Sequence, residues 1–344
     1  MPKEWKQINF MSKKFLYFII PIAVLTGFYF TTKKKELHGD FERKLISNTG
    51  ISQTDKITIP GIVDGITLDN RNLWINQRFN ILKYNADPRK QVLLKGNYGA
   101  QGNPIVNLFV ENDSVFYYQG NTPTINFVNL NVDSIVRYYK LLFPISYFIK
   151  SKDNSFLFQE NVPKNVYSQI HYQDFKSGTQ KINTNVFSHE TGSGIRYSGS
   201  FLSTQDKKYL FFVSFYDNYI YCMDYKGDLK YKIKAVDSQD QTLEIIKEDQ
   251  VYYLSPKANI LRLSACIYND KLLVASKVRA SNQSEEGFKK NSTIDVYNVE
   301  DGKYQYSFYL PKFYNIDPSN MVVSQAGLMY ANYGSTILTY QLKL

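Results

Sequence analysis

Short alternating runs of hydrophobic and polar residues fill the chain from residue 56 onward. Each run is bounded by Asn, Asp or Gly, and most of the region has no amphipathic segment of helix length. Side chains alternate between the two faces of a strand, so a period of two with turn residues at both ends predicts β-strands. The one segment with a helical pattern is 242–247, where we expect a short helix. The pattern therefore predicts an all-β domain over residues 56–344.

The strands recur as a unit of about four. Two strands joined by a polar turn precede a third strand that ends in a polar residue, and a turn and a short fourth strand follow. The third strands end at Asn85, Asn129, Asp174, Asp224, Asn298 and Gln341. Successive ends are 44, 45, 50, 74 and 43 residues apart, and such a period is typical of a β-propeller. We expect six blades, with an insertion in blade five placed at 238–257 and 279–291.

The two ends of this domain complement each other. The last repeat stops after its third strand, and a lone strand at 56–60 precedes the first repeat. This N-terminal strand would supply the fourth strand of blade six and remove an exposed sheet edge. A pair of β-sandwiches is the competing architecture, but it explains neither the spacing nor the matching ends.

The closing strand resembles the clasp of six-bladed propellers of the NHL and related sensor-like families. The Gly-rich segment 96–104 is similar to the blade-entry loop of such propellers. The resemblance covers residues 56–344 in architecture only. It implies a six-bladed exported propeller and no particular activity.

An uncharged run of 18 residues, 15–32, lies between two groups of lysines. An apolar helix of about 20 residues spans a bilayer, so we expect a basic segment at 1–14, a signal anchor or transmembrane helix at 15–32 and a stalk at 33–55. A cleavable signal peptide is the alternative, although no small-residue cleavage site follows the run. Met11 is an alternative start to Met1. The propeller would then be exported, facing the periplasm or the cell surface.

The net charge of +10 does not indicate a nucleic-acid partner. Nine basic and four acidic residues lie within 1–44, so half of the excess flanks the apolar run, where basic side chains face lipid headgroups. The aromatic content of 16% favours strands. Cys222 and Cys266 are too few for a disulfide framework, and whether they pair is left open.

Candidate chemistry is sparse. His189 and Glu190, in the loop entering blade four, are the candidate catalytic pair, because a His and a carboxylate can exchange protons and inter-blade loops converge near the axis. Asp64, Arg71 and Arg78 of blade one are candidate ligand-binding residues. His171 lies mid-strand, and we expect a structural role. No cofactor or metal motif is found, although a divalent metal in the channel stays open.

These observations favour a binding or scaffold module with a protein or small-molecule ligand at a loop face. The alternative is a propeller-type hydrolase or lyase that uses loops at the axial mouth.

Overall fold

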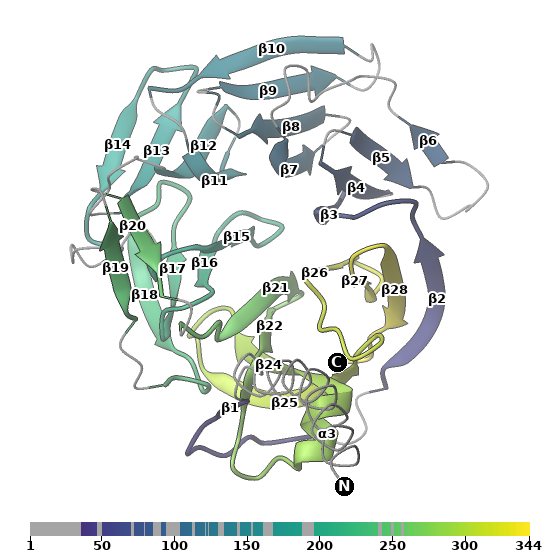
Figure 1. The fold of residues 1–344 in the computed structure, drawn as a ribbon. Coiled ribbons are helices and arrows are strands. Elements are labelled where there is room, and N and C mark those ends of the chain that lie inside the picture. The colour runs from purple at the N-terminus through teal and green to yellow at the C-terminus, as the bar shows by residue number, and fades with distance from the viewer. Residues whose placement is uncertain are drawn as a thin grey trace, which may run out of the picture. The chain divides into compact units, whose positions relative to one another are not determined.

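The alternating runs form six four-stranded antiparallel sheets. Figure 1, drawn from a computed structural model, shows them arranged radially as the blades of a propeller. In five blades the strands pair in chain order, and the first strand is nearest the axis. The first strands of neighbouring blades contact one another in a closed ring. The predicted six-bladed all-β architecture is confirmed.

The structure describes residues 36–46, 50–69, 72–78, 80–84, 91–93, 104–111, 114–120, 122, 124–129, 134–142, 145–152, 154–160, 168–187, 196–239, 243–248, 251–255 and 258–344. His38–Leu344 form one compact unit. The predicted anchor at 15–32 lies outside the described residues. In the described ranges, no helix has the length and apolar character needed to cross a membrane.

The blades, each from its first strand outward, are as follows. Blade one is β3 (Gly65–Leu68), β4 (Leu73–Gln77), β5 (Asn80–Tyr84) and β6 (Gln91–Leu93); blade two is β7 (Ile105–Glu111), β8 (Ser114–Gln119), β9 (Thr124–Asn129) and β10 (Ser134–Lys140); blade three is β11 (Ile145–Lys150), β12 (Ser155–Glu160), β13 (Ile170–Asp174) and β14 (Gln180–Asn183); blade four is β15 (Gly199–Ser203), β16 (Leu210–Ser214), β17 (Tyr219–Met223) and β18 (Leu229–Lys234); blade five is β21 (Arg262–Tyr268), β22 (Lys271–Ser276), β24 (Asn291–Asn298) and β25 (Tyr304–Pro311); blade six is β26 (Asn320–Val323), β27 (Leu328–Asn332), β28 (Thr336–Gln341) and β2 (Ser52–Thr58).

Strand β2 closes the ring. It pairs antiparallel with β28, from Ser52 opposite Gln341 to Thr58 opposite Thr336, and becomes the outer strand of blade six. Its Ile57 is buried against the neighbouring blade-one cluster. The strand predicted at 56–60 therefore does supply the fourth strand of the last blade, and it starts four residues earlier than expected.

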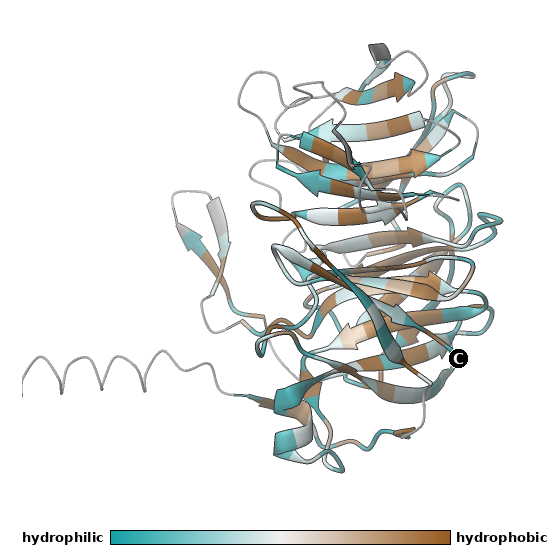
Figure 2. Cartoon of the chain, turned by 90° about the vertical axis from the view of Figure 1, so that its right-hand side faces the viewer, coloured by the Kyte–Doolittle hydropathy of each residue, from teal (hydrophilic) through white to brown (hydrophobic). Residues whose placement is uncertain are grey.

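The meander gives the propeller two faces of different construction. We call the first the crossover face, because it carries the blade-to-blade connections and the links between second and third strands; it includes residues 59–64, 141–142, 277–290 and 312–319. We call the second the hairpin face, because it carries the turns between first and second and between third and fourth strands; it includes residues 69, 151–152, 204–209, 269–270, 298–303 and 324–327. In Figure 2 the propeller is seen edge-on, with the C-terminus at the hairpin face and helix α3 (Glu285–Lys290) on the opposite side.

The insertion of blade five consists of two parts, as predicted, but its secondary structure differs from the expectation. The helix predicted at 242–247 is wrong, because Ile245–Glu248 is strand β19, which pairs with β20 (Val251–Leu254). Ile245 and Ile246 are β-branched and lie opposite Leu254 and Tyr253, a pairing that suits a strand better than a helix. The second part contains β23 (Val278–Arg279) and helix α3, whose N-cap Ser284 accepts a hydrogen bond from the Gly287 backbone.

Residues 38–46, within the segment predicted as a stalk, lie against blade five. The Ile46 N–H donates to the Ser307 carbonyl at 3.0 Å, and the Ser307 N–H donates to the Lys44 carbonyl at 2.9 Å. Farther toward the N-terminus, the Gly39 N–H donates to the Arg279 carbonyl at 2.8 Å. The chain thus passes from the crossover face along the outer strand of blade five before it enters blade six as β2.

Arg43 anchors this segment through a buried ion pair. Its Nε lies 2.7 Å from Asp295 Oδ1 and its Nη2 lies 2.9 Å from Asp295 Oδ2, with both side chains fully buried. The remaining donors reach the Val278 carbonyl, Gln283 Oε1 and Ser276 Oγ. A buried charge is tolerated only when it is paired and hydrogen-bonded, and every guanidinium nitrogen here is engaged.

Aromatic side chains fill the spaces between the blades. Phe116 of blade two packs edge-on against Phe156 of blade three, with ring centroids 5.6 Å apart. Cys222 and Cys266 are both free and belong to different buried clusters, so the two do not form a disulfide. Burial raises the pKa of Cys222 to about 11 and that of Cys266 to about 12, as expected for thiols that serve as core.

Candidate functional site

The axis of the propeller holds a cavity of about 350 Å³, open toward the crossover face. First strands of all six blades, or the residues just before them, line it; one residue from each blade is Asp64, Asn107, Tyr147, Ser200, Ala265 and Asn320. Apart from Asp64, the lining is mainly uncharged. A concave cavity with converging polar groups is the usual place for a ligand to bind, so both ends of this channel are candidate sites.

The predicted site residues are scattered. Asp64 lines the channel, and its N–H donates to the Asn76 carbonyl at 2.9 Å. Arg78 lies after β4 with φ 51°, and its carbonyl accepts from the Ile105 N–H at 2.6 Å, outside the lining of that cavity. Arg71, His189 and Glu190 lie outside the described residues. Their assignment as site residues stays a prediction.

His171 has the packing role expected of it. Its ring stacks on Phe158 with centroids 5.5 Å apart, and its Nε2 lies 2.9 Å from Glu160 Oε2. Burial lowers the pKa of His171, and the neighbouring carboxylate opposes this change only in part. The imidazole therefore lies within blade three rather than at the channel.

The opposite end of the channel, at the hairpin face, carries a charged cluster. A cavity of about 330 Å³ opens there, and Glu111 and Lys207 are among its lining residues. Lys150 and Lys207 donate to the two carboxylate oxygens of Glu111, one lysine to each oxygen. The three residues come from blades two, three and four, so the contacts tie three blades together at the mouth. We call these residues the mouth cluster.

The surroundings of the mouth cluster are aromatic and largely shielded from water. Lys150 lies 5.5 Å from the ring centroid of Phe116, and Lys207 lies 5.7 Å from that of Phe109. Burial alone would raise the pKa of Glu111, but hydrogen bonds from the two ammonium groups outweigh it, so the pKa is lowered. The carboxylate is therefore ionised at neutral pH and is poorly suited to act as a general acid.

A turn in blade four aims Lys207 at the mouth. The Thr204 N–H donates to the Tyr209 carbonyl at 3.0 Å, and the Lys207 N–H donates to the Thr204 carbonyl at 2.9 Å. Lys207 has φ 55°, a left-handed conformation that is uncommon for a residue with a side chain. As a result, Lys207 lines the channel mouth whereas the adjacent Lys208 lines a second hollow.

The rest of the mouth offers amide and hydroxyl groups. These come from the turns of three blades and are Ser203, Gln205, Asn269, Ser324 and Gln325. Asp69 also lines the cavity, but its carboxylate accepts from Trp74 Nε1 at 2.7 Å and from Asn72 within its own blade. The mouth thus combines a held ion cluster with several neutral hydrogen-bonding groups.

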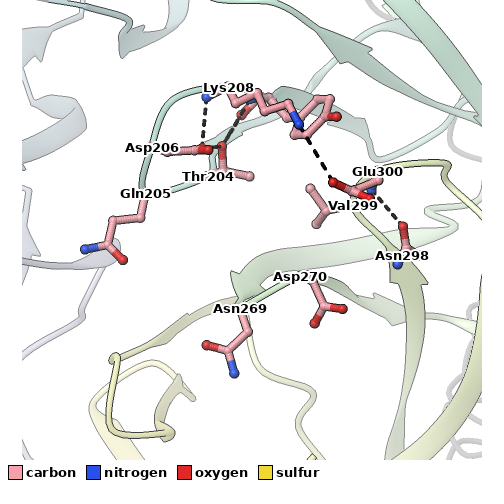
Figure 3. A pocket seen from close by; sticks show the side chains of 10 residues that line it. Thr204, Gln205, Asp206, Lys208, Asn269, Asp270, Asn298, Val299 and Glu300 are labelled. Atoms are coloured by element: carbon pink, nitrogen blue, oxygen red, sulfur yellow. Dashed lines mark hydrogen bonds and ion pairs between the residues drawn. The ribbon is translucent and has the colours of Figure 1, made fainter.

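The second hollow lies between blades four and five on the same face and measures about 670 Å³ (Figure 3). Lys208 Nζ lies 3.7 Å from Glu300 Oε1 across it. Asp206 accepts from Thr204 Oγ1 at 2.6 Å and from the Lys208 N–H at 3.0 Å, and these hydrogen bonds lower its pKa. The Asp206 carboxylate is thus bonded within its own turn, and the ion pair of Glu300 with Lys208 across the hollow is long and exposed.

Clusters of potential metal ligands were sought among the described residues only. No group of three or more His, Cys, Asp or Glu in those residues is arranged to hold a metal ion. A divalent ion in the channel, which the sequence leaves open, stays untested.

Reasoning from the sequence missed the mouth cluster. Glu111 and Lys150 are the last residues of the first strands of blades two and three, a shared position that the repeat pattern contains. Since all first strands run in the same direction, charged residues at their ends must converge at one mouth. Aligning the blades by this position would have found two of the three residues; the turn conformation of Lys207 has no comparable signal.

The architecture and the axial site define a six-bladed β-propeller. Solved structures with the same fold include the Cps50 (Swd1) β-propeller domain of Myceliophteria thermophila, at 9% identity, TM-score 0.51 and coverage of 85% of this chain and 100% of that one. A chain of the mitotic checkpoint complex matches at 10% identity and TM-score 0.54 over 87% and 96% of the two chains. Streptogramin B lyase matches at 12% identity and TM-score 0.50 over 85% and 97%.

At such low identity these similarities show the fold alone. No family model matches the chain, and no curated protein matches it. The neighbours span a chain of a protein assembly and an enzyme, so the fold is compatible with binding and with catalysis.

Proposed function

We propose that this protein is an exported, membrane-anchored binding module that takes a polar ligand at the hairpin-face mouth of its channel. The observation that carries the proposal is the mouth cluster, in which two lysines from separate blades share the Glu111 carboxylate beside a cavity of about 330 Å³. The uncharged run at 15–32 would hold the chain in the membrane. The resemblance to exported NHL-like propellers is part of this proposal and adds no activity.

The geometry favours binding for two reasons. The cluster is held from three blades. Glu111 and Lys150 are the last residues of strands in two blades, and Lys207 lies in a turn of a third; these blades contact one another around the ring. The amide and hydroxyl groups around it can donate and accept hydrogen bonds without a change of ionisation. A preformed polar mouth of this kind suits a hydroxyl- or amide-bearing ligand, such as a saccharide or a short peptide segment of a protein.

A propeller-type lyase or hydrolase is the second candidate, because three ionisable groups do gather at the axial mouth. Glu111, however, is the only acid of the cluster and is held ionised by both lysines. Catalysis by proton transfer needs a group whose pKa lies near the working pH. The lowered pKa of Glu111 therefore favours binding over catalysis.

The ligand site is tested by thermal unfolding of the full chain against a panel of neutral and acidic mono- and disaccharides and dipeptides. A ligand that binds only the folded state raises the unfolding midpoint. We expect at least one class to do so for the wild type and for Lys208→Ala, and to lose the effect in Lys207→Ala. Equal midpoint shifts in Lys207→Ala and the wild type would place the site elsewhere. Chemical conversion of a bound compound would favour the enzyme.

The anchor is tested separately, by flotation of the full chain with membranes and by protease accessibility of the propeller in intact cells. We expect the chain to float and the propeller to be cleaved from outside the cytoplasmic membrane. A variant that lacks residues 15–32 should stay at the bottom of the gradient. Flotation of this variant would show that another part of the chain holds it to the membrane.

A further inference from the structure

Large apolar side chains are exposed at the blade-to-blade connections. Leu142 follows β10 and is 77% exposed, Ile62 precedes β3 and is 74% exposed, and Tyr314 and Ile316 lie between β25 and β26 at 80% and 52%. All four therefore lie on the crossover face. Among the described residues, no large hydrophobic side chain is similarly exposed at a turn of the hairpin face. A set of exposed apolar groups at the connections of one face, without a counterpart at the turns of the other, indicates an interaction surface.

The turn that carries Tyr314 is built to display it. The Phe313 N–H donates to the Ile316 carbonyl at 3.2 Å and the Ile316 N–H donates to the Phe313 carbonyl at 2.9 Å, which closes a two-residue turn. Tyr314 and Asn315 have φ of 49° and 63°, as in a type I′ turn, where Asn or Gly is usual and a tyrosine is uncommon. An aromatic residue in this conformation costs backbone free energy, and such strain concentrates at functional positions.

The chain enters the propeller on the same face. Gly39 donates to the Arg279 carbonyl and the Ser281 N–H donates to the Phe41 carbonyl at 2.8 Å, and residues 279–281 follow the second strand of blade five. The uncharged run 15–32 ends seven positions before Gly39. With residues 15–32 embedded in a membrane, only residues 33–38 connect the membrane segment to the crossover face.

We infer that the crossover face lies on the lipid surface, with Ile62, Leu142, Tyr314 and Ile316 in the interfacial region of the bilayer. This inference rests on the proposed membrane anchor. Tyrosine is enriched at membrane interfaces because its ring is apolar and its hydroxyl is wet, and aliphatic side chains beside it add buried apolar area. The hairpin face and its mouth cluster then point away from the membrane, open to ligands.

The test attaches the fluorophore NBD to single cysteines in the full chain, reconstituted in phosphatidylcholine vesicles with or without a doxyl-labelled lipid. Tyr314→Cys carries the probe on the crossover face. Tyr138→Cys is the matched control, since Tyr138 is 66% exposed on the outer strand of blade two. Cys222 and Cys266 are buried and should not react in the folded protein.

We expect the probe at position 314 to shift to shorter wavelength in vesicles and to lose most of its emission to the doxyl lipid, while the probe at 138 does neither. Equal, weak quenching at both positions in floated vesicles would overturn the inference and leave the anchor intact. The probe at 314 could also shift in a way that depends on protein concentration, without quenching by the doxyl lipid. This result would overturn the inference and assign the crossover face to contact with a second copy or another protein. Failure of the chain to float at all would overturn the anchor itself.

Discussion

The two faces of this propeller differ in where they keep their charge and their apolar surface. On the hairpin face the mouth cluster is partly accessible and several neutral polar groups surround it. On the crossover side the Arg43–Asp295 ion pair is fully buried, apolar side chains project outward at the connections, and only the ion pairs of helix α3 are widely exposed among those of residues 277–290. The blades are the same repeat, so the connections and the strand ends, and not the strand interiors, determine what each face can bind.

The buried pair should dominate stability. Arg43→Ala leaves Asp295 as an uncompensated buried charge, so we expect a loss of about 3–5 kcal/mol in the free energy of unfolding. Urea unfolding of the full chain in detergent, followed by far-UV circular dichroism, measures it. Lys44→Ala is the control, because this neighbour is exposed and should change stability by no more than about 0.5 kcal/mol. Similar losses for the two variants would show that Arg43 does not anchor the segment.

The mouth cluster should contribute less. Glu111→Gln removes the carboxylate that two lysines share, and we expect a loss of about 1.5–3 kcal/mol. Glu300→Gln, which removes a distant and exposed partner of Lys208, should have no measurable effect. A loss as large as that of Arg43→Ala would mean that the mouth cluster and the buried Arg43–Asp295 pair contribute equally to the free energy of unfolding.

The pH dependence of Glu111 sharpens this prediction. The folded-state pKa is lowered from its ordinary value of 4.5, so the stabilisation is fully present above that value and is lost as the pH falls through the lower folded value. The wild type and Glu111→Gln should therefore differ at pH 7 and converge in acid. A difference between them that is the same at pH 7 and at acid pH would exclude the ion cluster as its source.

Tyr314→Gly should have a smaller effect of the opposite sign. Glycine adopts positive φ without strain, so the substitution should raise the free energy of unfolding by up to about 1 kcal/mol. The larger conformational entropy of glycine in the unfolded chain reduces this gain. Tyr138→Gly, inside strand β10, should instead destabilise by about 0.5–1 kcal/mol. Destabilisation by Tyr314→Gly would show that the ring packs for stability, which would remove the strain argument for the crossover face.

The repeat and its closure were readable from the sequence because they depend on local pattern. The spacing of the third-strand ends and the lone strand before the first repeat predicted both the blades and the pairing of β2 with β28. The charged contacts were not readable, because the strand pattern does not specify which side chains meet: Glu111 contacts lysines 39 and 96 positions away, and Arg43 contacts Asp295 across 252. The prediction of a helix at 242–247 was wrong because pairing with β20, and not the local pattern alone, determines the conformation of this segment.

The smallest predicted effect concerns His171, which lines a small cavity with Leu142 of the crossover face. Burial lowers its pKa from 6.5, so its neutral form is favoured in the fold; stability is fully present above pH 6.5 and decreases as the pH falls from there toward the folded value. We expect the urea midpoint of the wild type to fall more between pH 7.5 and 5.5 than that of His171→Gln.

Glu160→Gln provides the opposite change. The Glu160 carboxylate supports the charged imidazole, so its removal should lower the pKa of His171 further and make the fall in midpoint steeper than in the wild type. Over the same interval the Glu111 carboxylate stays ionised, since its pKa is lowered from 4.5. A midpoint that falls equally in the wild type and in His171→Gln would mean that protonation of His171 does not change stability over this interval.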